Sequence, residues 1–222
     1  MRMPRPVSEI FPVWDTLAPD ERAYLAQSAV YRTVPKGKIL QQGKECVGLF
    51  LIESGQLRSF LLSDEGKEVT LFRLLDGDIC LFSSSCVVRE IQFDVTIESE
   101  KETNLWMIPF SAYDRLMKSS LAVSNYTTKL MATRFSEVMW VMEQIVFKSI
   151  DARLAQFLLE ESALEESDRL SITHEKIARH MGTAREVVTR MLKYFSSEEL
   201  VQLSRGGISI VGRKGLENLA KQ

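Results

Sequence analysis

Hydrophobic and polar residues alternate in short runs between positions 31 and 109, and turns marked by Gly separate the runs. Strands that recur about every 8–12 residues with such turns are typical of an all-β sandwich or barrel. We therefore predict a β-rich domain, preceded by a helical pattern over residues 8–29. The predicted strands are Leu49–Ile52, Leu57–Leu62, Val69–Leu74 and Phe93–Glu98, and the predicted turns are Pro35–Gly37, Glu53–Gly55, Asp64–Gly66 and Asp76–Asp78.

The pattern then changes to a helical one. Neither Gly nor Pro occurs from Ser111 to Lys148, which predicts one long helix. Five apolar residues in it follow a 4-3-4-3 spacing, as in the seam between two packed helices. We predict that this stripe is the interface of a homodimer, and the alternative is the core-facing stripe of an ordinary helix. The stripe consists of Met131, Phe135, Val138, Met142 and Ile145.

The C-terminal part contains two helical patterns joined by a tight turn at Gly182. Thr173 is placed to cap the first helix, and Thr183 with Glu186 has the spacing of a capping box for the second. Two helices with a short Gly turn, the second basic and amphipathic, are typical of a helix-turn-helix. The second helix is expected from about Thr183 to Phe195, with an apolar face of Val188, Met191, Leu192 and Phe195 and a polar face of Arg185, Glu186, Thr189, Arg190 and Lys193.

The polar face carries chemistry that suits base edges. Arg can bind guanine through two hydrogen bonds, and Glu can accept one from cytosine. Because phosphates repel carboxylates, Glu186 favours base readout, although capping alone is the alternative. A strand, a Gly turn and a second strand follow over residues 199–211 and predict a wing. The candidate phosphate contacts are Thr173, Thr183, Thr189, Lys193 and, in the turn of the wing, Arg205.

Charge is distributed unevenly along the chain. Nine basic and four acidic side chains lie between Arg169 and Lys214, so this part carries a surplus of five positive charges. The net charge of the whole chain is −2, which leaves −7 for the remainder. An acidic body with a basic C-terminal module suits a protein that touches DNA with one end.

The chain also has few features of an exported or membrane protein. No apolar run approaches the roughly 18 residues that span a bilayer, and no apolar segment of a secretory signal follows the N-terminus. Three cysteines without such a signal make a disulfide framework improbable. We expect a cytoplasmic protein without a membrane partner.

With these motifs in place, the chain resembles the Crp/Fnr family of bacterial transcription factors over nearly its whole length. Arg153–Leu158 resembles the helix that opens the family's winged domain, and Gly182–Leu192 resembles its recognition signature. The resemblance implies an α+β fold: a cyclic-nucleotide-binding-like β-roll over 1–110, a dimerisation helix over 111–149 and a winged helix-turn-helix over 150–222. It also implies that Arg185, Glu186 and Arg190 read bases. The implied partners are double-stranded DNA with a palindromic operator, a second copy of the chain, and RNA polymerase.

The sensor part departs from the pattern of the relatives that bind cyclic nucleotides. Their β-roll uses a Gly-Glu pair and an Arg-Ser/Thr-Ala triplet, and neither occurs within Gly77–Phe93. Cyclic AMP is therefore not the expected effector. No Cys precedes Cys46, which excludes the N-terminal four-Cys cluster of the iron–sulfur relatives. Both histidines lie in the helix-turn-helix, so the sensor has no histidine for haem. A lone Cys80 thiolate is the weaker alternative, and we expect no cofactor.

A Ser- and Cys-rich patch remains as the candidate effector site. Two functional interpretations are that the patch binds a small molecule or that it senses oxidants through its thiols. The alternative is that it only packs, because a free Cys behaves as a small buried hydrophobe. The alternative for the whole protein is a small-molecule-binding module whose C-terminal domain contacts protein rather than DNA. An enzyme is not expected, because the chain has no metal-ligand spacing and no phosphate loop. The patch candidates are Cys80, Ser83, Ser84, Ser85, Cys86 and Arg89.

Overall fold

The computed structural model describes residues 4–42, 48–81 and 94–222. Close contacts divide the chain into two compact units. Unit 1 comprises residues 1–62 and 71–138, and unit 2 comprises residues 63–70 and 139–222. Each unit has a hydrophobic core of its own. No helix of the described residues is long and apolar enough to cross a membrane.

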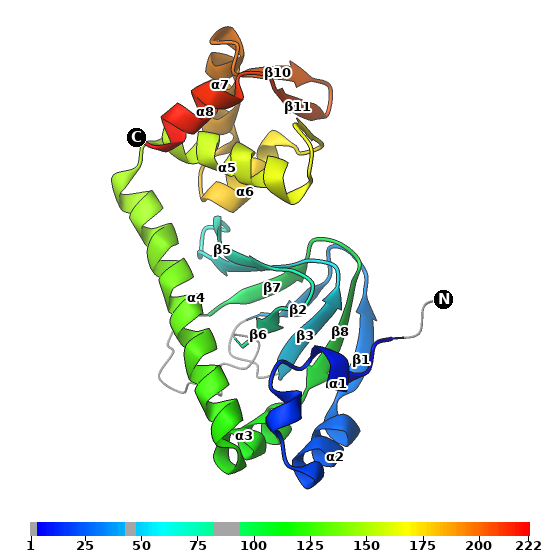
Figure 1. The fold of residues 1–222 in the computed structure, drawn as a ribbon. Coiled ribbons are helices and arrows are strands. Elements are labelled where there is room, and N and C mark those ends of the chain that lie inside the picture. The colour runs from blue at the N-terminus through cyan, green and yellow to red at the C-terminus, as the bar shows by residue number, and fades with distance from the viewer. Residues whose placement is uncertain (1–3, 43–47, 82–93) are drawn as a thin grey trace. The chain divides into compact units, whose positions relative to one another are not determined.

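Unit 1 contains two four-stranded sheets (Figure 1). The strand orders are β1-β8-β3-β6 and β2-β7-β4-β5. A buried cluster that includes Phe50, Leu57 and Ile97 contains side chains from both sheets. The strands are β1 Val30–Val34, β2 Ile39–Gln41, β3 Leu49–Ser54, β4 Leu57–Leu62, β5 Glu68–Leu74, β6 Ile79–Cys80, β7 Thr96–Ser99 and β8 Thr103–Ile108.

Most of the strand predictions are confirmed. Runs 49–52, 57–62 and 69–74 are β3, β4 and β5. The predicted run 93–98 is confirmed in its second half as β7, while Phe93 lies outside the described residues. Gly55 makes the turn between β3 and β4 with φ of +113°, and a Cβ there would lie 2.6 Å from Thr103 Cα. Only glycine fits such a position. The sequence reasoning missed β1, β2, β6 and β8.

Helices cover the second core of unit 1, which includes Leu25, Tyr113 and Val123. The prediction of one helix from 111 to 148 is wrong, because Ser120 takes an extended conformation with φ of −113° and ψ of 113°. Such a conformation needs neither Gly nor Pro, so the lack of helix breakers did not reveal it. The helices are α1 Val7–Ile10, the 3-10 turn η1 Trp14–Thr16, α2 Pro19–Ser28, α3 Phe110–Ser119 and α4 Leu121–Phe147, the last of which runs from unit 1 into unit 2.

Unit 2 is a winged helix-turn-helix, together with residues 63–70 from the hairpin between β4 and β5. Its small sheet has the order β10-β11-β9. Its core gathers side chains from each of the four helices after residue 149, among them Leu154, Ile177, Leu192 and Leu216. The elements are α5 Ile150–Leu164, β9 Arg169–Leu170, α6 His174–Met181, α7 Arg185–Ser197, β10 Val201–Ser204, β11 Gly207–Ile210 and α8 Arg213–Ala220.

Candidate nucleic-acid interface

Helices α6 and α7 form the helix-turn-helix that the sequence predicts. The Thr173 hydroxyl accepts a hydrogen bond from the Lys176 N–H at 3.1 Å, which confirms the predicted cap of α6. Gly182 ends α6 in the left-handed conformation, with φ of 66° and ψ of 34°. The turn to α7 therefore needs a residue without a Cβ, or one that tolerates this conformation.

The apolar face of α7 fixes the direction of its polar face. Val188, Leu192 and Phe195 are buried, as predicted from their spacing. Burial of each such side chain contributes about 1.5–3 kcal/mol, so the helix is held firmly on this side. Arg185 and Arg190, on the other side, are exposed.

The start of α7 differs from the prediction. The helix begins at Arg185 with Ala184 as its N-cap, in an extended conformation and without a side-chain hydrogen bond. The Thr183–Glu186 capping box is therefore not formed, because the chain turns into the helix one residue later than expected. Within the described residues, no hydrogen bond or ion pair engages the Glu186 carboxylate. This carboxylate is consequently available for a partner outside the chain.

The exposed cations of unit 2 differ in whether they have an acidic partner. Arg179 lies 3.0 Å from the Glu68 carboxylate, and Arg213 pairs with Asp168. The Ser162 hydroxyl and then Arg213 hold the pKa of Asp168 below its usual value. In the described part of the chain, no carboxylate pairs with the four exposed cations of α7 and the wing. These are Arg185, Arg190, Lys193 and Arg205.

The remaining candidate phosphate contacts are hydroxyls at the edge of this surface. Thr173 is exposed, and Thr183 is partly exposed. Thr189 donates to the Arg185 carbonyl at 2.9 Å and lies 2.9 Å from Nδ1 of His174. The sequence reasoning missed His174, because its neighbour Thr189 lies 15 residues away and no local spacing links the two.

The predicted wing is a hairpin of β10 and β11. Gln202 lies opposite Ser209, and Gly206 makes the turn with φ of +80°. Arg205 is exposed beside that glycine. The turn therefore presents one cation next to a glycine in the left-handed conformation.

Comparisons with known proteins agree with this architecture. Two family models match, the Crp-like helix-turn-helix domain over residues 152–219 and the cyclic nucleotide-binding domain over residues 31–120. A solved structure from Eubacterium rectale, assigned to the regulators of the Crp/Fnr family, is 52% identical. The match covers 96% of this chain and 100% of that one, with a TM-score of 0.94.

The chain belongs to the Crp/Fnr family.

Curated members of the Crp/Fnr family match at lower identity. The cyclic AMP receptor protein of Thermus thermophilus is 28% identical over 94% of this chain and 96% of its own length. The transcriptional activator protein FnrA of Stutzerimonas stutzeri is 26% identical over 85% of this chain and 80% of its own length. This Crp/Fnr protein is a DNA-binding transcription regulator with an effector-binding type of N-terminal domain.

Helix α4 of this Crp/Fnr protein carries the stripe that was predicted to form a dimer. Three of its members are exposed: Phe135 to 67%, Met142 to 52% and Ile145 to 43%. Met131 and Val138 instead pack partly against the cores of unit 1. Five large apolar residues of α4 that the predicted stripe does not include are also exposed: Leu121, Met139, Trp140, Val146 and Phe147. Of these, Met139 and Val146 lie at helical spacing from Phe135 and Met142 and extend the exposed part of the stripe.

The sensor patch of this Crp/Fnr protein is only partly described. Cys80 is fully buried in β6, within the cluster that contains Phe50. Burial shields its thiol from solvent and favours the packing interpretation. The remaining candidates lie outside the described residues. These are Ser83, Ser84, Ser85, Cys86 and Arg89.

A buried arginine of α4, which the sequence reasoning also missed, enters the β-roll near Cys80. Arg134 is 5% exposed, donates to the Glu137 carboxylate at 2.8 and 3.0 Å, and lies 4.8 Å from the ring centre of Phe72. It also reaches the Ile79 carbonyl at 3.5 Å, one residue before Cys80. Its Nε is buried without a hydrogen-bond partner among the described residues.

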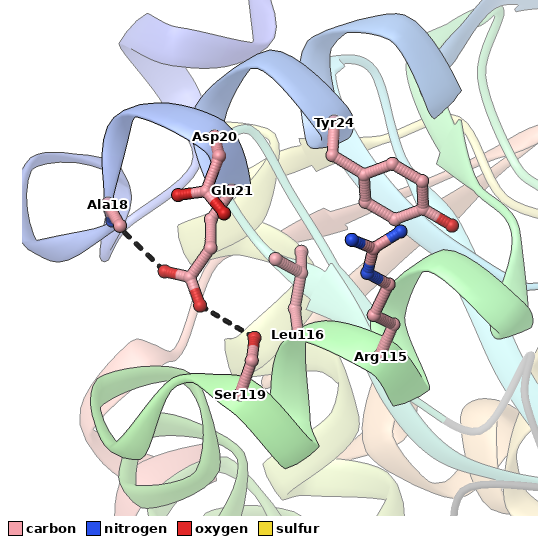
Figure 2. Close-up of a pocket in the computed structure, with 7 residues that line it drawn as sticks. All are labelled: Ala18, Asp20, Glu21, Tyr24, Arg115, Leu116 and Ser119. Atoms are coloured by element: carbon pink, nitrogen blue, oxygen red, sulfur yellow. Dashed lines mark hydrogen bonds between the residues drawn. The ribbon is translucent and has the colours of Figure 1, made fainter.

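A small pocket of about 140 Å³ lies between α2 and α3 (Figure 2). Its Glu21 carboxylate is already engaged within the protein. The Glu21 carboxylate accepts from the Ala18 N–H at 3.0 Å and from the Ser119 hydroxyl at 2.6 Å. The Arg115 guanidinium lies 4.3 Å from the ring centre of Tyr24. We therefore assign no ligand to this pocket.

Proposed function

We propose that this Crp/Fnr protein binds a palindromic operator as a homodimer, under the control of an effector in its β-roll that is not cyclic AMP. The unpaired polar surface of α7 carries the proposal. Arg185, Glu186 and Arg190 share the exposed face, whereas other cations of the same unit are paired with carboxylates. A charged face that is left unpaired suits an external partner of matching hydrogen-bond pattern.

In this proposal Arg185, Glu186 and Arg190 read base edges in the major groove. Glu186 supports readout in particular, because a carboxylate placed among cations would weaken a surface that gripped only phosphates. Hydroxyls and cations around the reading face hold the DNA backbone. These are Thr173, Thr183, Lys193 and Arg205. Thr189, the remaining candidate from the sequence, donates its one proton to the Arg185 carbonyl and therefore supports this surface without donating to a phosphate.

The homodimer would form through α4. Large exposed apolar residues on one helix are costly in water and favour association. We place Phe135 and Met142 of the predicted stripe at the seam, with Met139 and Val146 beside them. Two-fold symmetry would place two copies of α7 in successive major grooves, about 34 Å apart, which requires a palindromic site.

The effector is proposed to act close to Cys80–Cys86. At the position of the family's Gly-Glu pair, Asp78 accepts a hydrogen bond from the Leu75 N–H at 2.8 Å and lies 3.9 Å from Arg134. Its carboxylate therefore serves the turn and the helix rather than a ribose. Because Arg134 belongs to α4, it would transmit a conformational change of this turn to that helix. RNA polymerase is the further partner that we propose.

Selection of bound duplexes from random DNA tests the proposal, with and without metabolite extract. We expect recovery of an inverted repeat with half-sites about one helical turn apart. The triple variant R185A/E186A/R190A is the control and should recover no consensus. Failure of the unmodified protein to enrich any sequence would overturn the proposal and favour a C-terminal domain that contacts protein.

A further inference from the structure

The first residue of α6 connects the two helices of the helix-turn-helix. The Thr189 hydroxyl has a single proton, which it donates to the Arg185 carbonyl at 2.9 Å. Its oxygen therefore accepts when Nδ1 of His174 approaches to 2.9 Å, so Nδ1 carries a proton. The other ring nitrogen, Nε2, is thus the atom of His174 that gains or loses a proton.

The surroundings of His174 disfavour its charged form. Partial burial and then the positive charge of Arg185 hold the pKa of His174 below its ordinary value of 6.5. Arg185 is the charged group of α7 that acts on the His174 ring. On α6, the next two residues after His174 are Glu175 and Lys176, which carry opposite charges. The N-terminal end of α6 also disfavours a cation. In the unbound protein His174 is therefore mostly neutral at pH 7.

We infer that His174 is a further DNA-contacting residue, whose Nε2 takes up a proton and donates to a backbone phosphate when the operator binds. This inference rests on the proposed function. His174 is only partly buried, follows Thr173 in the chain, and is joined through the Thr189 hydroxyl to the backbone of Arg185, so it neighbours two proposed contacts. A phosphate placed there offsets the repulsion by Arg185 and provides an acceptor for Nε2–H.

The uptake of a proton gives DNA binding a pH dependence of defined sign. At pH values between the pKa of His174 in the free protein and its pKa in the complex, the affinity for DNA rises as pH falls. The limit is about tenfold per pH unit for each protomer, because one proton is bound per histidine. The hydrogen bond from His174 Nδ1 to Thr189 is present in the free and in the bound protein, and it holds the first turn of α7 in place in both.

The test is a titration of the duplex recovered by the selection above, from pH 5.5 to 7.5. We expect the affinity of the unmodified protein to fall with rising pH. The variant His174→Gln should have a much smaller slope, since an amide can still donate to Thr189 but does not titrate. The chain has only two histidines, so His180→Gln is the matched control. His180 is buried against Phe157 and should leave the slope unchanged.

A second measurement needs no variant. Nitrogen-15 spectra of the two histidines report the tautomer and charge of each ring. We expect His174 to be neutral with a proton on Nδ1 in the free protein at pH 7, and to carry protons on both nitrogens with the duplex. Equal pH slopes for the unmodified protein and His174→Gln, or a neutral His174 in the complex, would overturn this inference but leave the proposed function standing. Absence of specific binding at every pH would overturn the proposed function and the inference with it.

Discussion

At the scale of the residue, the presence or absence of an acidic partner separates the cations of unit 2 by role. Arg179 and Arg213 have carboxylate partners, so their charges serve the fold. Arg190 and Lys193 have none among the described residues and are exposed on α7. Two neighbouring cations on one helix can nevertheless act differently, because base edges carry sequence information and phosphates do not.

Replacement of these two cations should separate the two roles. Arg190→Ala is expected to cost about 1–3 kcal/mol and to relax the preference at one position of each half-site. Lys193→Ala should weaken binding to all sequences alike and lower the salt slope by about one. Fluorescence anisotropy with the operator and its single-base variants measures both. A uniform loss in both variants would contradict the base-reading role of Arg190.

Two glycines of unit 2 allow a backbone effect to be separated from a packing effect. Gly206 in the wing has φ of +80°, and a Cβ added there would meet open space, whereas a Cβ on Gly182 would lie 2.4 Å from Val69 Cγ2. Gly206→Ala should lower the free energy of unfolding by about 1–2 kcal/mol, from the left-handed conformation alone. Gly182→Ala should lower it further. Urea denaturation monitored by circular dichroism checks both, and equal losses would show that Val69 yields without cost.

At the scale of the element, some apolar residues of α4 pack against the cores of unit 1, whereas others are exposed to solvent. Val138 lies partly against the core that contains Phe72, while Phe135 is exposed to 67%. A charge at Val138 would therefore disturb folding as well as any dimer. Phe135 is the better position to test association.

We expect Phe135→Glu to convert the dimer to a monomer, since two carboxylates would meet at the seam without water. Thr133→Glu is the matched control, because Thr133 is also exposed on α4 but points away from Phe135 at the helical spacing. Sedimentation at micromolar concentration measures the mass of each. A monomeric unmodified protein, or a dimer that survives Phe135→Glu, would contradict the placement of the seam.

At the scale of the whole molecule, family membership and ligand are separate questions. The cyclic nucleotide-binding model matches residues 31–120, yet the Gly-Glu and Arg-Ser/Thr-Ala elements are absent from Gly77–Phe93. A phosphate buried without its arginine would leave a charge unpaired at low dielectric, which is costly.

Calorimetry with cyclic AMP and cyclic GMP is accordingly expected to give no heat of binding. Tight binding that Arg89→Ala abolishes would reveal a phosphate site in a different sequence pattern. For the thiols, Cys80→Ser and Cys86→Ser should change the response of DNA affinity to the effector if the patch is sensory. Unchanged responses in both variants would leave only the packing role.

The amino-acid pattern was sufficient to predict the features that depend on neighbouring residues. The spacing of Val188, Leu192 and Phe195 predicted the buried face of α7, and Thr173 and Gly182 predicted both ends of α6. Period and capping operate within a few residues, so they can be read without a fold. The strands between Gly turns followed for the same reason.

Contacts between residues that are distant in the chain became visible in the folded protein alone. Tertiary packing broke the predicted helix at Ser120, where Leu116 and Val123 on either side pack into one core. It buried Arg134 in the β-roll and joined His174 to Thr189. These outcomes depend on which surfaces meet, and a contact between two elements has no signature in the local pattern of either one.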